Sequence, residues 1–155
     1  MSCELQPEDI EILAGAITEY FEVTTGDPAQ IRSAWLLQQS EPVLREDYNG
    51  LIEIGGGYRG SICFSAPRRL LDFILLASGH GSYAEADYLD VVGEIANTLS
   101  GRARRYFGET LAISPPRAFK RDDPAVAPRT DGTPYAIPIV FRAQEANLVV
   151  HLSRA

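Results

Sequence analysis

The clearest pattern of apolar and polar positions in the chain lies between Tyr83 and Phe107. At about 100° per residue, the apolar side chains of this stretch fall on one side of a helix. They are Tyr88, Val92, Ile95, Ala96, Leu99, Ala103 and Tyr106. The stretch contains no proline, and Gly108 follows it as a stop signal. We therefore predict a long amphipathic helix over 83–107, with its apolar side buried.

The opposite side of this predicted helix is polar. Asp90, Glu94 and Asn97 stack at spacings i, i+4 and i+7, and Gly101 continues the line. Gly93 and Gly101 stand in the helix interior, where glycine costs about 1 kcal/mol relative to alanine. We interpret these glycines as keeping the surface low, so that another backbone can come close to Glu94 and Asn97. From the helix and the motif alone, an ordinary solvated face is the more common interpretation.

The other periodic stretches are shorter. Apolar residues at helical spacing predict helices over 7–23 and 68–78, the second capped by Ser65 and buried nearly all round. Apolar runs and alternation predict strands over 51–54, 61–64, 111–119, 135–142 and 147–153. The range 31–39 is either a strand or a short helix. In 147–153, the alternation places His151 on the more exposed face.

Glycine and proline supply the turn signals. The glycines at 55–57 and 60 predict a hairpin between the strands over 51–54 and 61–64. A phosphate-binding loop is disfavoured there, because the Lys-Ser/Thr ending is missing. Pro115 and Pro116 confine the strand over 111–119 to an edge or a bend, and 120–133 is a long loop. The order of elements predicts an α+β protein with one mostly antiparallel sheet packed by helices.

Length and composition narrow the class of protein. A chain of 155 residues is expected to form a single domain over 1–155. A net charge of −7 argues against nucleic acid and anionic lipid as partners. The chain has no apolar run of about 20 residues that would span a membrane, and its acidic start is unlike a signal peptide. Two cysteines make no disulfide framework, so a cytoplasmic protein is expected.

The sequence lacks most of the residue motifs that are typical of enzyme active sites. It contains no G-x-S-x-G motif, no Cys–His pair at a useful spacing and no cluster of metal ligands. His80 stands between two glycines and is interpreted as part of a linker between helices. Arg102, Arg104 and Arg105 are placed favourably near the negative end of the helix dipole. The alternative for these arginines is a contact with an acidic partner.

The motif Asp90-x-x-x-Glu94-x-x-Asn97 resembles the signature of the CheC/CheX/FliY family of chemotaxis phosphatases. Two more segments resemble the family: G-Y-R-G-S-I-C-F-S-A-P at 57–67, followed by a helix, and I-S-P-P at 113–116. The helix over 7–23 carries no second Glu-x-x-Asn pair, so the chain resembles the single-site, CheX-like type. The resemblance implies a phosphatase that acts on the phosphoaspartate of a CheY-like response regulator in two-component signalling.

The resemblance also implies roles for the motif residues. Asn97 would position the attacking water, and Glu94 would pair with the lysine of the receiver domain. Asp90 would support either the helix or the contact rather than the chemistry. Mg²⁺ would be bound by the receiver, so no metal or other cofactor is expected on this chain, and a homodimer is expected. Two alternatives remain: a module that binds a receiver without hydrolysis, and a structural subunit related to flagellar switch proteins.

Overall fold

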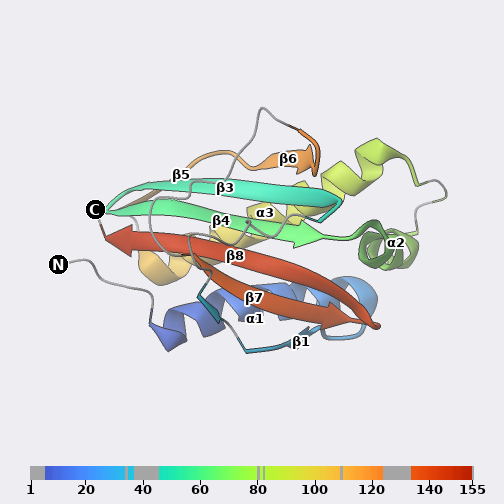
Figure 1. Cartoon of the computed structure of the whole chain (residues 1–155), viewed down its shortest axis with the longest axis horizontal. Helices are drawn as coiled ribbons and strands as arrows, with labels where there is room; N and C mark the ends of the chain where they lie inside the picture. Colours follow the sequence, from blue (N-terminus) through green and yellow to red (C-terminus); the bar gives the residue numbers. More distant parts are fainter. Residues whose placement is uncertain are drawn as a thin grey trace.

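The computed structural model describes residues 6–33, 35–36, 46–79, 81, 83–108, 110–123 and 134–154. Three helices and eight strands lie within these residues (Figure 1). Their bounds are α1 Pro7–Thr25, β1 Gln30–Ile31, β2 Trp35–Leu36, β3 Tyr48–Gly56, β4 Tyr58–Ala66, α2 Arg68–Ala77, α3 Glu85–Phe107, β5 Leu111–Ile113, β6 Arg117–Lys120, β7 Tyr135–Phe141 and β8 Gln144–Arg154. The element order matches the predicted order of helices and strands.

The described strands form one sheet in the order β1-β7-β8-β4-β3-β5, with β2 also paired to β7 and β6 also paired to β3. Every pairing is antiparallel. The hairpin of β3 and β4 turns at Gly57, and its two strands are longer than the apolar runs that predicted them. The α+β prediction, with one antiparallel sheet packed by helices, is therefore confirmed.

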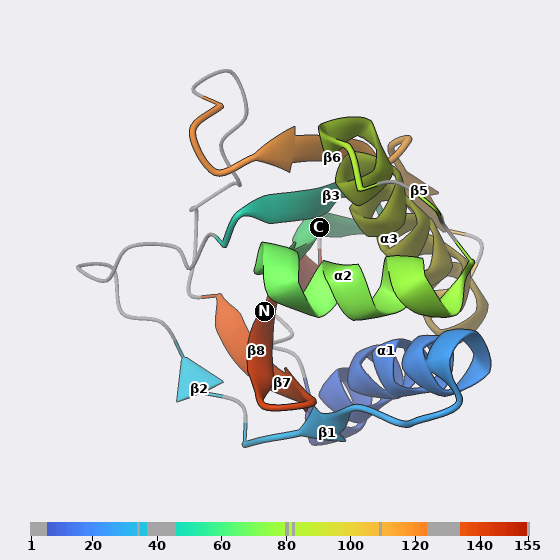
Figure 2. The ribbon, with the colours of Figure 1, turned by 90° about the vertical axis from the view of Figure 1, so that its right-hand side faces the viewer.

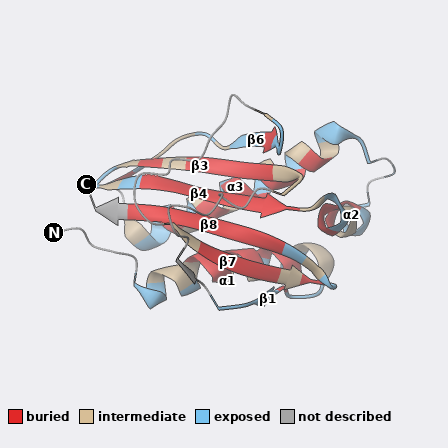
Figure 3. Cartoon of the chain, in the orientation of Figure 1, coloured by how far each residue is buried: buried red, intermediate tan, exposed pale blue. Residues whose placement is uncertain are grey.

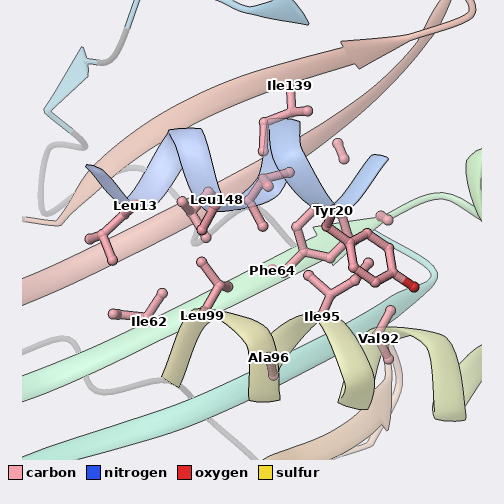
Figure 4. Packing of buried hydrophobic residues seen from close by; sticks show 14 of the residues in the cluster. Leu13, Tyr20, Ile62, Phe64, Val92, Ile95, Ala96, Leu99, Ile139 and Leu148 are labelled. Atoms are coloured by element: carbon pink, nitrogen blue, oxygen red, sulfur yellow. The ribbon is translucent and has the colours of Figure 1, made fainter. Parts of the chain in front are cut away.

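All three helices cover the same face of the sheet (Figure 2). Strand alternation sends every second side chain toward them, and these residues are buried along the central strands (Figure 3). Figure 4 shows the resulting core, in which Leu13 of α1, Leu99 of α3 and Ile62 of β4 point toward one another. Contacts with both α1 and the sheet thus fix the position of α3.

Helix α3 and the sheet approach each other closely at Gly50 of β3. A Cβ atom at this position would overlap the carbonyl oxygen of Val92 and would lie 3.2 Å from Cβ of Ala96. Only glycine leaves room for the helix backbone here. This contact holds the buried side of α3 against β3 and leaves the opposite side of the helix outside the core.

Two predictions about α2 are wrong. Its N-cap is Pro67, whereas Ser65 lies in β4 and its hydroxyl accepts a hydrogen bond from the N–H of Glu46. The helix is also not buried all round, because Leu76 is 64% exposed. One side of α2 packs on the core through Leu70, Leu71, Ile74 and Leu75, and the other side has no neighbouring layer among the described residues.

Two further predictions of burial are wrong. Tyr106, predicted to be buried, is 39% exposed, because the last turn of α3 reaches the first turn of α1, where the phenol hydrogen-bonds to Asp9. That hydrogen bond raises the pKa of Tyr106. His151, predicted to lie on the more exposed face, is buried. Its face of the sheet carries a second buried cluster of Leu51, Cys63, Phe119, Ala136 and Val149.

The described part of the range 31–39 contains no helix: Ile31 ends β1, residues 32–33 lie outside the strands, and Trp35–Leu36 form β2. Residues 34 and 37–39, His80 and the end of the predicted loop at 124–133 lie outside the described residues. The prolines at 115 and 116 separate β5 from β6, and among the described strands both pair only with β3, so the predicted bent edge is confirmed.

Candidate functional site

The predicted long helix is present as α3, from Glu85 to Phe107. The carboxylate of Asp87 caps its start by accepting a hydrogen bond from the N–H of Ala84 at 2.9 Å. Gly108, with φ of 96°, ends it. Acidic residues in the first turn and Arg104 and Arg105 in the last turn complement the helix dipole. Residues at the ends of the helix itself, Asp87 and Gly108, therefore determine where α3 begins and ends.

The structure places the motif residues where the pattern predicted them. Asp90, Glu94 and Asn97 are all exposed, and they lie on the side of α3 that faces away from the core. The opposite side is buried through Tyr88, Val91, Val92, Ile95, Ala96, Leu99 and Ala103. The Glu94 and Asn97 side chains are one helical turn apart, so a partner can contact both at once.

Helix α1 flanks one side of this exposed strip. Arg102 forms an ion pair with Glu19 of α1, which ties the two helices together. Tyr20 of α1 lies near Glu94. Burial raises the pKa of the Tyr20 phenol, and the negative charge of the Glu94 carboxylate raises this pKa further. Glu94 therefore lies on the α1 side of the strip.

A groove flanks the other side of the strip, next to Asn97. Its volume is about 390 Å³. It is lined by Asn97, Ser100, Gly101 and Arg104 of α3 and by Ile113, Ser114, Pro115 and Pro116 of the bend between β5 and β6. The groove therefore has one wall from the helix and one from the proline bend.

The bend is anchored to the sheet by two hydrogen bonds. The N–H of Ser114 donates to the carbonyl of Glu53, and the N–H of Glu53 donates to the hydroxyl of Ser114, both at 2.9 Å. The two prolines then carry the chain out of the strand ladder, since proline has no N–H to donate. As a result, the wall of the groove is fixed relative to α3 and does not depend on the loop beyond β6.

The two glycines of the strip have different neighbours. A Cβ atom at Gly93 would lie 3.9 Å from Cβ of Ala118 in β6, so part of the space beside Gly93 is occupied by the same chain. A Cβ atom at Gly101 would meet nothing within 4 Å. The open surface predicted next to the motif is therefore found at Gly101, on the floor of the groove.

Sequence reasoning did not place Ser100 or Ser114 at the site, and it gave Arg104 a contact with an acidic partner only as the alternative for a group of three arginines. The I-S-P-P segment was noticed, but nothing in the pattern showed that it lies beside Asn97. That juxtaposition depends on the pairing of β5 and β6 with β3, which also packs against α3. A pairing between segments about 60 residues apart leaves no periodic signal in either segment.

Among the described residues, no three His, Cys, Asp or Glu side chains lie together as a metal site would require. No helix of the described chain is long and apolar enough to cross a membrane. The absence of a resident cofactor, the cytoplasmic location, the single domain over 1–155 and the homodimer all stay predictions.

Comparison with known proteins identifies the family. The sequence model described as chemotaxis phosphatase CheX matches residues 48–140, which include the hairpin, α3 and the proline bend. No curated protein matches the chain in sequence.

Solved structures share the fold at low identity. The chemotaxis protein CheX from Desulfovibrio desulfuricans is 21% identical with a TM-score of 0.78, over 94% of this chain and 99% of that one. CheX from Vibrio vulnificus is 18% identical with a TM-score of 0.78, over 94% and 99% of the two chains. A CheX–CheY–BeF₃–Mg²⁺ complex from Borrelia burgdorferi is 12% identical with a TM-score of 0.73, over 92% and 96%. With the family match over more than half of its length, this chain belongs to the chemotaxis phosphatase CheX family.

Proposed function

We propose that this protein hydrolyses the phosphoaspartate of a CheY-like receiver domain, with Asn97 and Glu94 as the residues that act on the partner. One observation carries the proposal: the two side chains are exposed, one turn apart, on a helix whose other side is buried. A site of this kind acts on a group that another protein presents to it.

The chemistry of an acyl phosphate suits these side chains. Its carboxylate leaving group needs little protonation, and a loose transition state mainly requires that the attacking water be held in line. A carboxamide both donates and accepts hydrogen bonds, so Asn97 can orient water without being a strong base. Positioning of this kind accounts for on the order of a hundredfold in rate or more.

Glu94 has the role of an anchor in this proposal. Its exposed carboxylate is available to pair with a cation of the receiver, and Tyr20 and the ion pair of Arg102 with Glu19 support the surface beside it. Asp90, one turn earlier, extends the same acidic edge. In this proposal the receiver supplies the Mg²⁺ that neutralises the phosphoryl group; the CheX–CheY complex from Borrelia burgdorferi contains Mg²⁺.

The test of the proposal is the decay of a small panel of phosphorylated receivers, with and without this protein, followed as release of inorganic phosphate. At least one receiver is expected to lose its phosphoryl group faster when the protein is added. Binding of a phosphorylated receiver with an unchanged decay rate would contradict hydrolysis and favour a non-catalytic receiver-binding module. Co-purification with flagellar switch components, again without acceleration, would favour the structural subunit.

Glu94→Gln is expected to raise the KM for the phosphorylated receiver several-fold, on the order of threefold to tenfold, because it removes one charge from an exposed pair. The maximal rate should change much less, since Asn97 is retained. Steady-state dephosphorylation over a range of receiver concentrations separates the two quantities. A loss of maximal rate with KM unchanged would assign Glu94 to the chemistry instead.

Gly101→Ala is expected to stabilise the fold and to weaken the binding of the receiver. The added methyl group meets open space and favours the helix, so we expect a gain of up to about 1 kcal/mol in the free energy of unfolding. The same methyl group raises the floor of the groove beside Asn97, so the KM for the receiver is expected to rise. Gly15→Ala in α1, where an added Cβ also meets nothing within 4 Å, is the matched control. It should stabilise the protein and leave dephosphorylation unchanged; equal activity in both variants would show that Gly101 is not a contact.

A further inference from the structure

Arg104 lies on the same side of α3 as Asn97, seven residues later in the chain. Seven residues are nearly two turns, so the two Cα atoms are about 10 Å apart along the helix axis. Arg104 is exposed, and both residues line the groove between α3 and the proline bend. A partner seated over Asn97 therefore also covers Arg104.

Two other cations that contact α3 form ion pairs within the chain. Arg102 pairs with Glu19, and Lys120 of β6 pairs with Glu85 at 2.7 Å. Within the described part of the chain, no carboxylate lies within ion-pair distance of Arg104. The protein has a net charge of −7, so Arg104 is a positive group without an ion pair among the described residues of an acidic protein.

The helix dipole explains only part of this arrangement. It favours a cation anywhere in the last turn, and both Arg104 and Arg105 satisfy it. Arg105 is also exposed, but it does not line the groove. The dipole therefore accounts for the charge of the last turn, whereas it does not account for the position of Arg104 in the groove that Asn97 also lines.

We propose that Arg104 is a specificity-determining residue that binds a carboxylate on the surface of the phosphorylated receiver. The inference rests on the proposed function and extends it. Glu94 and Arg104 place opposite charges on the two sides of Asn97, about 15 Å apart along the helix axis. A receiver must then present a cation and an anion in the matching order, which permits one orientation and disfavours receivers that lack the anion.

The bound anion is distinct from the phosphoryl group that is transferred. A receiver that brings its phosphoryl group to Asn97 presents a different part of its surface two turns further along α3. Arg104 therefore contributes to binding, whereas the rate of the bound complex depends on Asn97.

The test compares Arg104→Glu with Arg105→Glu, which makes the same change of charge one residue away and outside the groove. For a receiver that the unmodified protein dephosphorylates, Arg104→Glu is expected to raise KM roughly fivefold or more at low salt, with the maximal rate within about twofold. The effect should shrink at about 1 M salt, where charges are screened beyond about 3 Å. Arg105→Glu should change KM less than about twofold.

Titration of each variant with the beryllium fluoride adduct of the receiver gives the dissociation constant without any hydrolysis. It therefore separates this inference from the proposed function, which fails on its own if the unmodified protein accelerates no receiver. Weaker binding by Arg104→Glu than by Arg105→Glu supports the inference. Equal binding by both variants overturns it, as does a loss of maximal rate at unchanged KM, which would place Arg104 on the phosphoryl group.

Discussion

Replacing Asn97 by alanine is expected to abolish the acceleration of receiver dephosphorylation, with a loss of about a hundredfold or more in maximal rate. The carboxamide is the one neutral group of the exposed strip that can both donate to and accept from a water molecule, and alanine can do neither. The measurement is single-turnover decay of the phosphorylated receiver with this protein in excess. Under these conditions the measured rate is that of hydrolysis within the complex and does not depend on how fast the two proteins associate.

The fold should not change in this variant, because Asn97 is exposed and alanine is a better helix former than asparagine. The melting temperature should therefore be unchanged or slightly higher. Glu11→Ala, an exposed substitution on α1, is a suitable control and should leave the decay rate unaltered. Full acceleration by Asn97→Ala would remove Asn97 from the chemistry, whatever the affinity of the variant for the receiver.

Gly50→Ala is expected to destabilise the protein by about 3 kcal/mol or more, although alanine is a modest change. The new Cβ would overlap the carbonyl oxygen of Val92, and a backbone atom cannot move aside as a flexible side chain can. For a chain of this size, a loss of that magnitude corresponds to a fall of roughly 6–12 °C in melting temperature. Thermal unfolding followed by circular dichroism measures it.

The Gly50 variant also tests how the site is supported. Because the overlap is with α3 itself, any protein that still folds should hold the helix further from β3 and should show reduced phosphatase activity. Gly15→Ala provides the contrast, since the same substitution in open space should be stabilising. A Gly50→Ala protein with unchanged melting temperature would show that α3 does not lie as close to the sheet as described.

The site helix could be predicted because its signal is local. Periodicity alone placed Glu94 and Asn97 opposite Ile95 and Leu99, and Gly108 marked the end. The proline bend was also local, since Pro115 cannot donate to a ladder. The groove was not predictable, because it forms only where β5 and β6 pair with β3 beside α3, and such pairing has no counterpart in the spacing of the residues involved.

The errors have the same physical origin. Alternation in β8 assigned His151 to one face of the sheet, but periodicity does not say whether that face is covered, and it is. Tyr106 continues the apolar stripe of α3, yet it remains 39% exposed and its phenol hydrogen-bonds to Asp9 of α1. Ser65 has the side chain of an N-cap, but the pairing of β4 with β3 and β8 continues through it and moves the helix start to Arg68.

The most direct test of the central claim is whether the side chain of Asn97 meets the phosphorylated receiver. The two amide protons of this side chain can be followed by NMR in ¹⁵N-labelled protein and assigned as the pair that is missing in Asn97→Asp. On titration with the beryllium fluoride adduct of a receiver that the protein dephosphorylates, we predict that this pair shifts, together with backbone amides of 94–104. Unmoved Asn97 signals at saturation, with shifts confined to another face of the protein, would contradict the account.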